Sequence, residues 1–313
     1  MNTKMGVMKL AVPLFFAIAY GPTQGLATPL LGSDVASFTV LGASTVTNVP
    51  TSTIVGNVGV WSSGGANAIT GFHSSPGVAV SDPQVTHGTV QAGTMTGTPN
   101  AKSAQQELVT AITNLGSLGA GTLEPADLTG LTLAPGVYTV PAGINLSGTL
   151  ILDGHGNANA AWVFQMQSTL ITAPNSVVSV INTGSGAGVY WDVRSSATID
   201  TSTTFLGNIL ALTSIDMNTT ATDLCGRALA ETGAVTLHQN SLSGTCSGIL
   251  TGSGGLSGGL EVTTTSAGGT QVGFLPYAPV GGGTAVPEPG TLGLMALSGL
   301  MMLGARLRRK TIA

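Results

Sequence analysis

Thr201-Ser202-Thr203-Thr204 and Thr219-Thr220-Ala221-Thr222 are two of four similar stretches in the second half of the chain. Thr172-Ala173-Pro174-Asn175 precedes them and Gln239-Asn240-Ser241-Leu242 follows, so the four begin at positions 172, 201, 219 and 239. Each stretch follows a short apolar or β-branched run without helical periodicity. A repeat of about 20 residues of this kind is typical of a β-solenoid, whose coils stack strand upon strand. We expect one face of the solenoid to carry a ladder of threonines, and function to lie there.

The composition also favours an all-β coil. Of 313 residues only 7% are charged and 4% are aromatic, whereas 46 are glycine. A compact globular enzyme is normally about a quarter charged. Small and β-branched residues suit a coil with a narrow interior and frequent turns. We therefore expect one elongated domain over residues 28–249.

Charge is distributed unevenly along the chain. Between residues 28 and 285 there are three basic and twelve acidic residues, a formal net charge of 3 − 12 = −9. Phosphate binding needs clustered lysine and arginine. We therefore expect no nucleic-acid partner.

The N-terminus has the three parts of an export signal. Met1 to Lys9 is positive, Leu10 to Tyr20 is apolar, and Gly25-Leu26-Ala27 offers small residues for cleavage. The apolar run is too short to span a membrane easily, which disfavours the alternative of an anchor. Residues 1–27 are predicted to be a signal peptide.

The C-terminus carries a second targeting signal. Pro287, Glu288 and Pro289 precede the apolar run 291–305, and the basic end follows with Arg306, Arg308, Arg309 and Lys310. In this order, residues 286–313 resemble the PEP-CTERM sorting signal of Gram-negative bacteria. The resemblance implies recognition by an exosortase-type enzyme, a cytoplasmic basic end and a body held outside the membrane at the cell surface. A plain C-terminal membrane helix would place the body on the same side.

Two further segments complete the expected organisation. Residues 250–285 are rich in Gly, Ser and Thr and are predicted to be a flexible stalk. Residues 99–115 follow 3.6-residue apolar spacing, with Thr98 as the expected N-cap and Pro99 at the first helical position. We expect this helix to cover one flank of the solenoid.

The strand-like segments carry a family resemblance over about residues 31–248. They are Leu131–Tyr138, Gly148–Asp153, Ala161–Met166, Ser195–Thr198, Leu210–Ile215, Gly226–Ala230 and Gly233–Leu237. In this order they look like the DUF3494 ice-binding protein family. The resemblance implies a right-handed, discontinuous parallel β-solenoid of triangular cross-section, with one long α-helix packed along its axis.

The two cysteines, Cys225 and Cys246, are spaced by about one coil. Neighbouring rungs lie about 4.8 Å from each other, within the Cα range of a disulfide. An exported protein also meets an oxidising compartment. We expect a disulfide, with two free thiols on different faces as the alternative.

Candidate catalytic groups are few. Asp200, Asp216, Asp223 with Arg227, and Asp192 with Arg194 could suggest a polysaccharide-active enzyme. Turn-forming aspartates and a surface ion pair explain them better. The four histidines lack metal-ligand spacing. We expect no enzyme, no metal site and no cofactor.

The threonine ladder favours ordered water over chemistry. Rows of methyl and hydroxyl groups spaced about 4.8 Å by about 6.6 Å can hold water in a fixed pattern that merges with ice. Some DUF3494 members carry a Thr, Ala or Gly, any residue, Thr or Asn pattern on the ice-binding face. Gln239 to Leu242 departs from it and is expected only to close the solenoid. The candidate ice-binding residues are Thr172, Asn175, Thr201, Thr203, Thr204, Thr219, Thr220 and Thr222.

Two interpretations of function remain at this point. The first is a monomeric, exported ice-binding protein that restrains ice growth or recrystallisation. The second is a structural or adhesive matrix component that uses the solenoid as a spacer and binds extracellular polysaccharide. An alternative for the threonines is that Thr is simply a good exposed strand residue.

Overall fold

The computed structural model describes residues 27–49, 51–61, 68–141, 143–265 and 268–281. The predicted signal peptide up to residue 26 lies outside the described residues. So do the sorting motif, with Pro287, Glu288 and Pro289, and the apolar run 291–305. Among the described residues no helix is long and apolar enough to cross a membrane.

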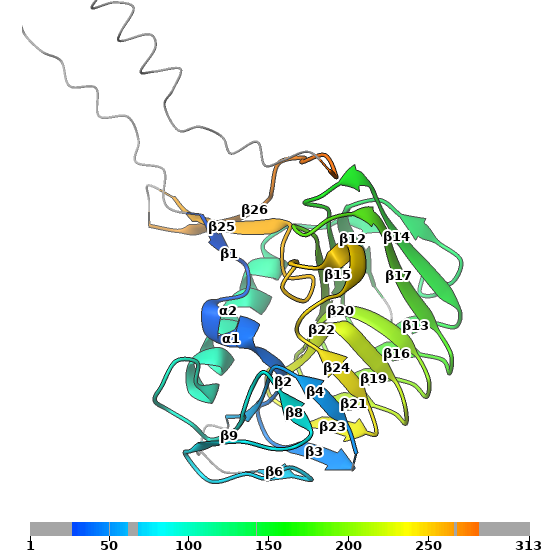
Figure 1. Cartoon of the computed structure of the whole chain (residues 1–313). Coiled ribbons are helices and arrows are strands. Elements are labelled where there is room, and N and C mark those ends of the chain that lie inside the picture. The colour runs from blue at the N-terminus through cyan, green and yellow to red at the C-terminus, as the bar shows by residue number, and fades with distance from the viewer. Residues whose placement is uncertain (1–26, 50, 62–67, 142, 266–267, 282–313) are drawn as a thin grey trace, which may run out of the picture.

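The body is a parallel β-solenoid with three faces, as predicted (Figure 1). The first face is a seven-stranded parallel sheet. In spatial order it contains β13 (Ile144–Leu146), β16 (Leu170–Thr172), β19 (Ala197–Ile199), β21 (Ile215–Met217), β23 (Val235–His238), β3 (Val46–Val49) and β6 (Ile69–Thr70).

The second and third faces belong to one 16-stranded sheet that bends round a corner. The second face contains β11 (Thr132–Leu133), β14 (Thr149–Asn157), β17 (Val177–Thr183), the first parts of β20 (Thr204–Ala211) and β22 (Thr222–Ala230), β24 (Ser241–Ser243), β4 (Thr53–Val55) and β8 (Val85–Thr86). The third contains β10 (Thr122–Leu123), β12 (Gly136–Val140), β15 (Ala161–Met166), β18 (Gly188–Val193), the second parts of β20 and β22, β2 (Phe38–Gly42), β5 (Asn57–Val60), β9 (Val90–Ala92) and the antiparallel β7 (Ala79–Val80).

The order of coils in space differs from their order in the chain. The N-terminal strands β2, β3 and β4 pair with the C-terminal strands β22, β23 and β24 on all three faces. Thr47, for example, lies in register with Thr236. The stack is therefore discontinuous, and residues far apart in the chain form one surface.

Aromatic rings fill the interior at one end of the solenoid. The rings of Phe164 and Trp191 stack with centroids 4.1 Å apart, and Tyr138 and Phe205 extend the column on either side. All four side chains are buried, together with the inward residues of every coil. This interior supplies most of the hydrophobic stabilisation.

The main helix is α2 (Ala101–Gly116), and a short α1 (Ser33–Ser37) packs beside it. The predicted start at Thr98 and Pro99 is wrong. Asn100 is the N-cap, because its backbone is extended and its side chain accepts a hydrogen bond from the Ser103 N–H at 2.9 Å. The six apolar positions of the expected stripe are all buried: Ala101, Ala104, Leu108, Ala111, Ile112 and Leu115.

The stripe forms a second hydrophobic core with the outer side of the third face. Val163, Tyr190 and Leu229 point outward from β15, β18 and β22 and are buried beneath the helix. Figure 1 shows both helices on this side of the solenoid. The third face is therefore closed to large partners.

The predicted flexible stalk is wrong for the described residues 250–265 and 268–281. A 3₁₀ turn, η1 (Gly248–Leu250), leads into the strands β25 (Leu260–Thr264) and β26 (Thr270–Phe274), and β25 also pairs with β1 (Thr28–Pro29). The alternating Leu260 and Val262 are buried against the helix-side core, a pattern that the Gly-rich composition hides. We call β1, β25, β26 and residues 275–280 the collar (Figure 1).

Candidate functional site

The exposed faces of the solenoid differ in charge. On the first face the middle residues of the strands point outward, and they include Ile171, Thr198, Asp216 and Thr236, so an acid interrupts this column. On the second face the leading row runs in unbroken register through Thr149, Val177, Thr204, Thr222, Ser241 and Thr53. None of these six is charged. The leading row of the second face therefore offers the more uniform surface.

The corner between these two faces contains the predicted threonine stretches. Asn175, Ser202, Thr220 and Gln239 each adopt a left-handed backbone, with φ between 56° and 62°. Each N–H donates to a carbonyl of the next coil: those of Thr201, Thr219, His238 and Val49. The four residues therefore occupy equivalent positions in successive coils, which fixes the register of the corner.

This register differs from the alignment of the four stretches by their first residues. In the structure, Asn175 aligns with Ser202 and Thr220, not with Thr204 and Thr222. The intervals between equivalent corner positions are unequal, because the loops elsewhere in the coils differ in length. In the sequence, only residues that tolerate a left-handed backbone at turns could have indicated this register.

Thr172 and Thr203 were predicted to lie on the surface, but both are buried. Thr172 is 1% exposed and Thr203 is 0% exposed, and their hydroxyl oxygens lie 3.0 Å apart. Thr172 Oγ1 accepts the Asp200 N–H at 2.7 Å, and Thr203 Oγ1 donates to the Ala173 carbonyl at 3.2 Å. Both side chains satisfy the turning backbone from inside and do not reach the surface.

Other buried polar side chains continue this inner column. Ser176 donates to the Leu146 carbonyl at 2.6 Å. Asn240 donates to the carbonyls of Asn218 and Ala221, and its N–H donates to Ser52 Oγ. Buried polar groups of this kind hold a corner rigid because each bond lost leaves a backbone group unsatisfied. The sequence reasoning missed Ser176, Asn240 and Ser52.

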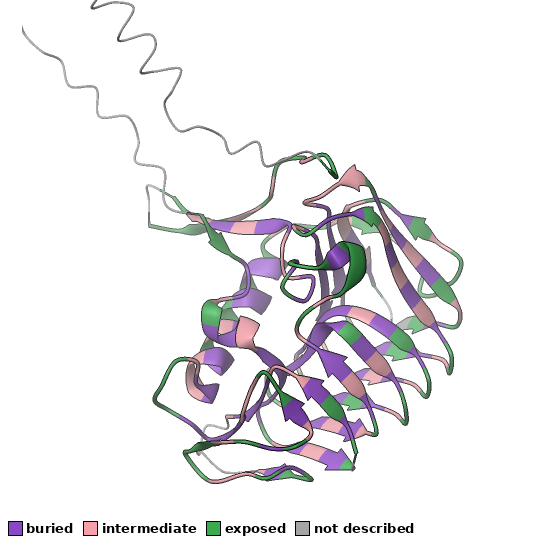
Figure 2. Cartoon of the chain, viewed as in Figure 1, coloured by how far each residue is buried: buried purple, intermediate pink, exposed green. Residues whose placement is uncertain are grey.

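The remaining candidates and their neighbours lie at or near the surface. Asn175, Thr201, Thr204, Thr219 and Thr220 are exposed, and Thr222 is half-buried (Figure 2 colours residues by burial). The structure adds residues that the repeat did not indicate. We define the threonine surface as Asn175, Thr201, Ser202, Thr219 and Thr220 at the corner, with the row Thr149, Thr204, Thr222, Ser241 and Thr53 beside it.

Several hydroxyl groups of this surface are free to hold water. Those of Thr204 and Thr219 make no hydrogen bond within the described residues, whereas Ser202 and Thr220 bond to each other at 3.0 Å. Asp200 lies at the margin. Hydrogen bonds from the Asn218 side chain and the Thr201 N–H lower the pKa of Asp200.

Three of the candidate catalytic side chains, Asp192, Arg194 and Arg227, make structural contacts. Arg194 pairs with the buried Asp192 at 3.0 Å. Arg227 is buried and donates to the carbonyls of Ala36, Gly244, Gly254 and Gly255. No cluster of three or more His, Cys, Asp or Glu side chains that could hold a metal occurs in the described part of the chain.

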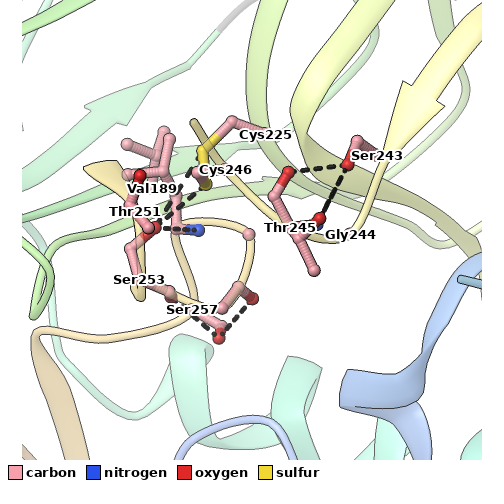
Figure 3. The surroundings of a disulfide bond; sticks show 12 residues. Val189, Cys225, Ser243, Gly244, Thr245, Cys246, Thr251, Ser253 and Ser257 are labelled. Atoms are coloured by element: carbon pink, nitrogen blue, oxygen red, sulfur yellow. Dashed lines mark hydrogen bonds between the residues drawn. A yellow bond between two sulfur atoms is a disulfide. The ribbon is translucent and has the colours of Figure 1, made fainter. Parts of the chain in front are cut away.

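The structure joins Cys225 and Cys246, with Cα atoms 4.6 Å apart. Figure 3 shows that Ser253 lies beside the disulfide, and its hydroxyl donates to Cys246 Sγ at 2.9 Å. The bond therefore ties β22 to the segment that leads into the collar.

Comparisons with known proteins agree with this architecture. The family model described as ice-binding-like matches residues 40–243, and the PEP-CTERM protein-sorting motif matches residues 285–310. An ice-binding protein of Nostoc sp. (strain HG1) is 44% identical over 218 residues, which cover 69% of this chain and 74% of that protein.

Two solved structures share the fold. The DUF3494 domain of ice-binding protein 1 from Shewanella frigidimarina is 30% identical with a TM-score of 0.61, covering 71% of this chain and 98% of that one. An ice-binding protein from an Antarctic biological consortium is 31% identical with a TM-score of 0.59, covering 75% and 96%. By its family match, its relatives and its fold, this chain belongs to the ice-binding-like family.

Proposed function

We propose that this protein is exported and adsorbs to ice through the threonine surface, as a monomer and without catalysing a reaction. The observation that carries the proposal is the uncharged row of Thr149, Thr204, Thr222 and Thr53 beside a corner of exposed threonines. The names of the relatives support the same activity.

The physical argument concerns the arrangement of water. Successive rungs lie about 4.8 Å apart, and the strands keep this spacing in register over several coils. Methyl groups restrict the water laterally, while hydroxyl groups without a protein partner anchor it. A charged surface would orient water strongly around each ion and disturb the pattern. The register shift of β14 falls beyond Asp153, and that of β20 falls between Phe205 and Gly207, so neither interrupts the pairing of the row.

The test uses the folded chain from Thr28 to Gly281, because cutting at residue 250 would remove β25 and β26. Thermal hysteresis and inhibition of ice recrystallisation are the readouts. We expect both activities at micromolar concentration. A folded sample without either at high micromolar concentration would overturn the proposal.

The PEP-CTERM match favours placement at the cell surface of a Gram-negative bacterium, with processing by an exosortase-type enzyme. The same match is compatible with a matrix component that binds polysaccharide. Retention of labelled protein on purified matrix polysaccharide, together with absent ice activity, would favour that second function.

A further inference from the structure

The collar fixes the place where the chain leaves the body. Over residues 275–280 the chain is bonded to Gly259, directly before β25, and to the end of β14 with the turn after it. Leu275 N–H donates to the Gly259 carbonyl at 2.9 Å, Asn159 Nδ2 to the Pro276 carbonyl at 2.9 Å, and Val280 N–H to the Gly156 carbonyl at 2.9 Å. Asn157 adds two contacts, because its side chain accepts the Ala278 N–H at 3.0 Å and its backbone forms a bridge with Pro279.

The place where the chain leaves the body lies far from the threonine surface, at the other end of strand β14. Thr149 belongs to the threonine surface and begins β14, whereas Asn157 ends β14 at the collar. Their partners in β17, Val177 and Thr183, are six residue steps apart because β14 contains a bulge between Asp153 and Asn157. At about 3.3 Å per step, the two ends lie roughly 20 Å apart. The two features therefore occupy opposite ends of the second face.

The collar also concentrates exposed apolar side chains. Phe274 is 41% exposed, Tyr277 64% and Val280 49%. Between residues 257 and 281 the only charged residue is Glu261. A surface with a single charged residue and exposed aromatic rings suits the interface of a lipid bilayer, where Tyr presents an apolar body and a polar tip.

The length of chain beyond the collar limits how far the collar can lie from a membrane. Ten residue steps lead from Gly281 to Thr291, where the apolar run before the arginine cluster begins. Fully extended, they reach at most about 35 Å, and Pro287 and Pro289 restrict their conformations. A tail inserted in a bilayer thus keeps the collar within reach of that bilayer, whereas the threonine corner stands at the far end of β14 from the collar.

We propose that, while the tail is in the membrane, the collar docks on the non-cytoplasmic surface of that membrane through Phe274, Tyr277 and Val280 and directs the threonine surface away from it. The partner is the lipid surface itself. This inference relies on the sorting tail and extends the proposed function by giving the ice-facing side its orientation.

The test uses the full chain, produced in a Gram-negative host that lacks an exosortase and recovered in membranes. Single-cysteine variants Tyr277→Cys and Thr204→Cys are labelled with a thiol-reactive fluorophore, and quenching by a nitroxide-bearing lipid is measured. Cys225 and Cys246 are joined and do not react. Phe274→Cys is a second collar probe if Tyr277→Cys fails to fold, and Thr113→Cys reports the exposed helix side.

We expect quenching at the collar probes to be at least three-fold stronger than at Thr204→Cys. Equal quenching, a reversed order, or recovery of the chain in the soluble fraction would overturn the proposal. The readout involves no ice. A chain that docks by its collar but lacks thermal hysteresis would contradict only the ice-binding proposal, and the converse result would contradict only the docking.

Discussion

The hydroxyl oxygens of Thr172 and Thr203 lie 3.0 Å apart inside the corner, although the sequence pattern places both on the surface. Their bond links neighbouring coils and completes the hydrogen bonding of the turn at Asp200 and Ala173. Part of the threonine pattern therefore shapes the corner, and only the remainder is available to ice.

Thr203→Val tests this division. Valine matches the shape of threonine but leaves the Ala173 carbonyl and Thr172 with fewer partners, so we expect a loss of about 1–2 kcal/mol in the free energy of unfolding. Urea denaturation measures the loss. Because Thr203 is buried, thermal hysteresis per folded molecule should remain close to that of the unchanged protein. A large loss of activity at unchanged stability would place Thr203 in direct contact with ice.

Thr220 occupies a left-handed backbone position, with φ 59°, that a β-branched residue rarely adopts. At the equivalent position two coils earlier the chain has Asn175, a residue that tolerates this conformation. We expect Thr220→Asn to raise the free energy of unfolding by about 1 kcal/mol and to lower ice activity, because an exposed methyl group is lost.

Asn175→Thr is the matched reverse change and should lower the free energy of unfolding by a similar amount. Thermal unfolding of the two variants gives both values. If both variants changed the free energy of unfolding in the same direction, the left-handed backbone would not determine which residue occupies positions 175 and 220.

The sequence predicts the coil, the helix stripe from Ala101 to Leu115 and the Cys225–Cys246 pairing, because each depends on local periodicity or on spacing near one coil. It does not predict that β3 stacks on β23, since the pairing of Thr47 with Thr236 is a long-range choice. The sequence predicts only part of the threonine surface. Thr149 and Thr53 come from coils outside the four stretches, and the corner register depends on left-handed residues that no apolar pattern marks.

The disulfide should contribute mainly by restricting the unfolded chain. For a loop of this length, Cys225→Ala with Cys246→Ala should lower the free energy of unfolding by about 3 kcal/mol. Scanning calorimetry of the double variant measures the change. Reductant should lower the unfolding temperature of the unchanged protein and leave the double variant unaffected. An equal response of both proteins to reductant would contradict this role.

Asp192 should make stability depend on pH. Burial raises the pKa of Asp192 to about 6, although Arg194 opposes the shift and Glu231 adds to it. Asp192 Oδ1 has no hydrogen-bond partner within the described residues. Because the folded pKa exceeds the unfolded value, the folded state binds more protons between about pH 4 and pH 6. The free energy of unfolding therefore falls as pH rises through this window, by about 3 kcal/mol.

Asp192→Asn should reduce this slope between about pH 4.5 and pH 6, measured as the unfolding temperature from pH 4.5 to pH 7.5. Burial also raises the pKa of Asp223 well above its usual value, so a slope of the same sign remains in this variant. Asp216→Asn, at an exposed position, is the control that keeps the full slope. An unchanged slope in Asp192→Asn would contradict the assignment.

The central claim is that the threonine surface contacts ice. The most direct measurement compares how Thr204→Tyr and Thr113→Tyr, labelled with the same fluorophore, adsorb to a growing ice hemisphere. Thr204 lies in the exposed row, and Thr113 lies on the exposed side of α2. Both changes add the same bulky ring at an exposed position. We predict at least a ten-fold loss of adsorption for Thr204→Tyr and none for Thr113→Tyr, with similar unfolding temperatures. Unchanged adsorption of Thr204→Tyr, or an equal loss in both variants, would contradict the claim.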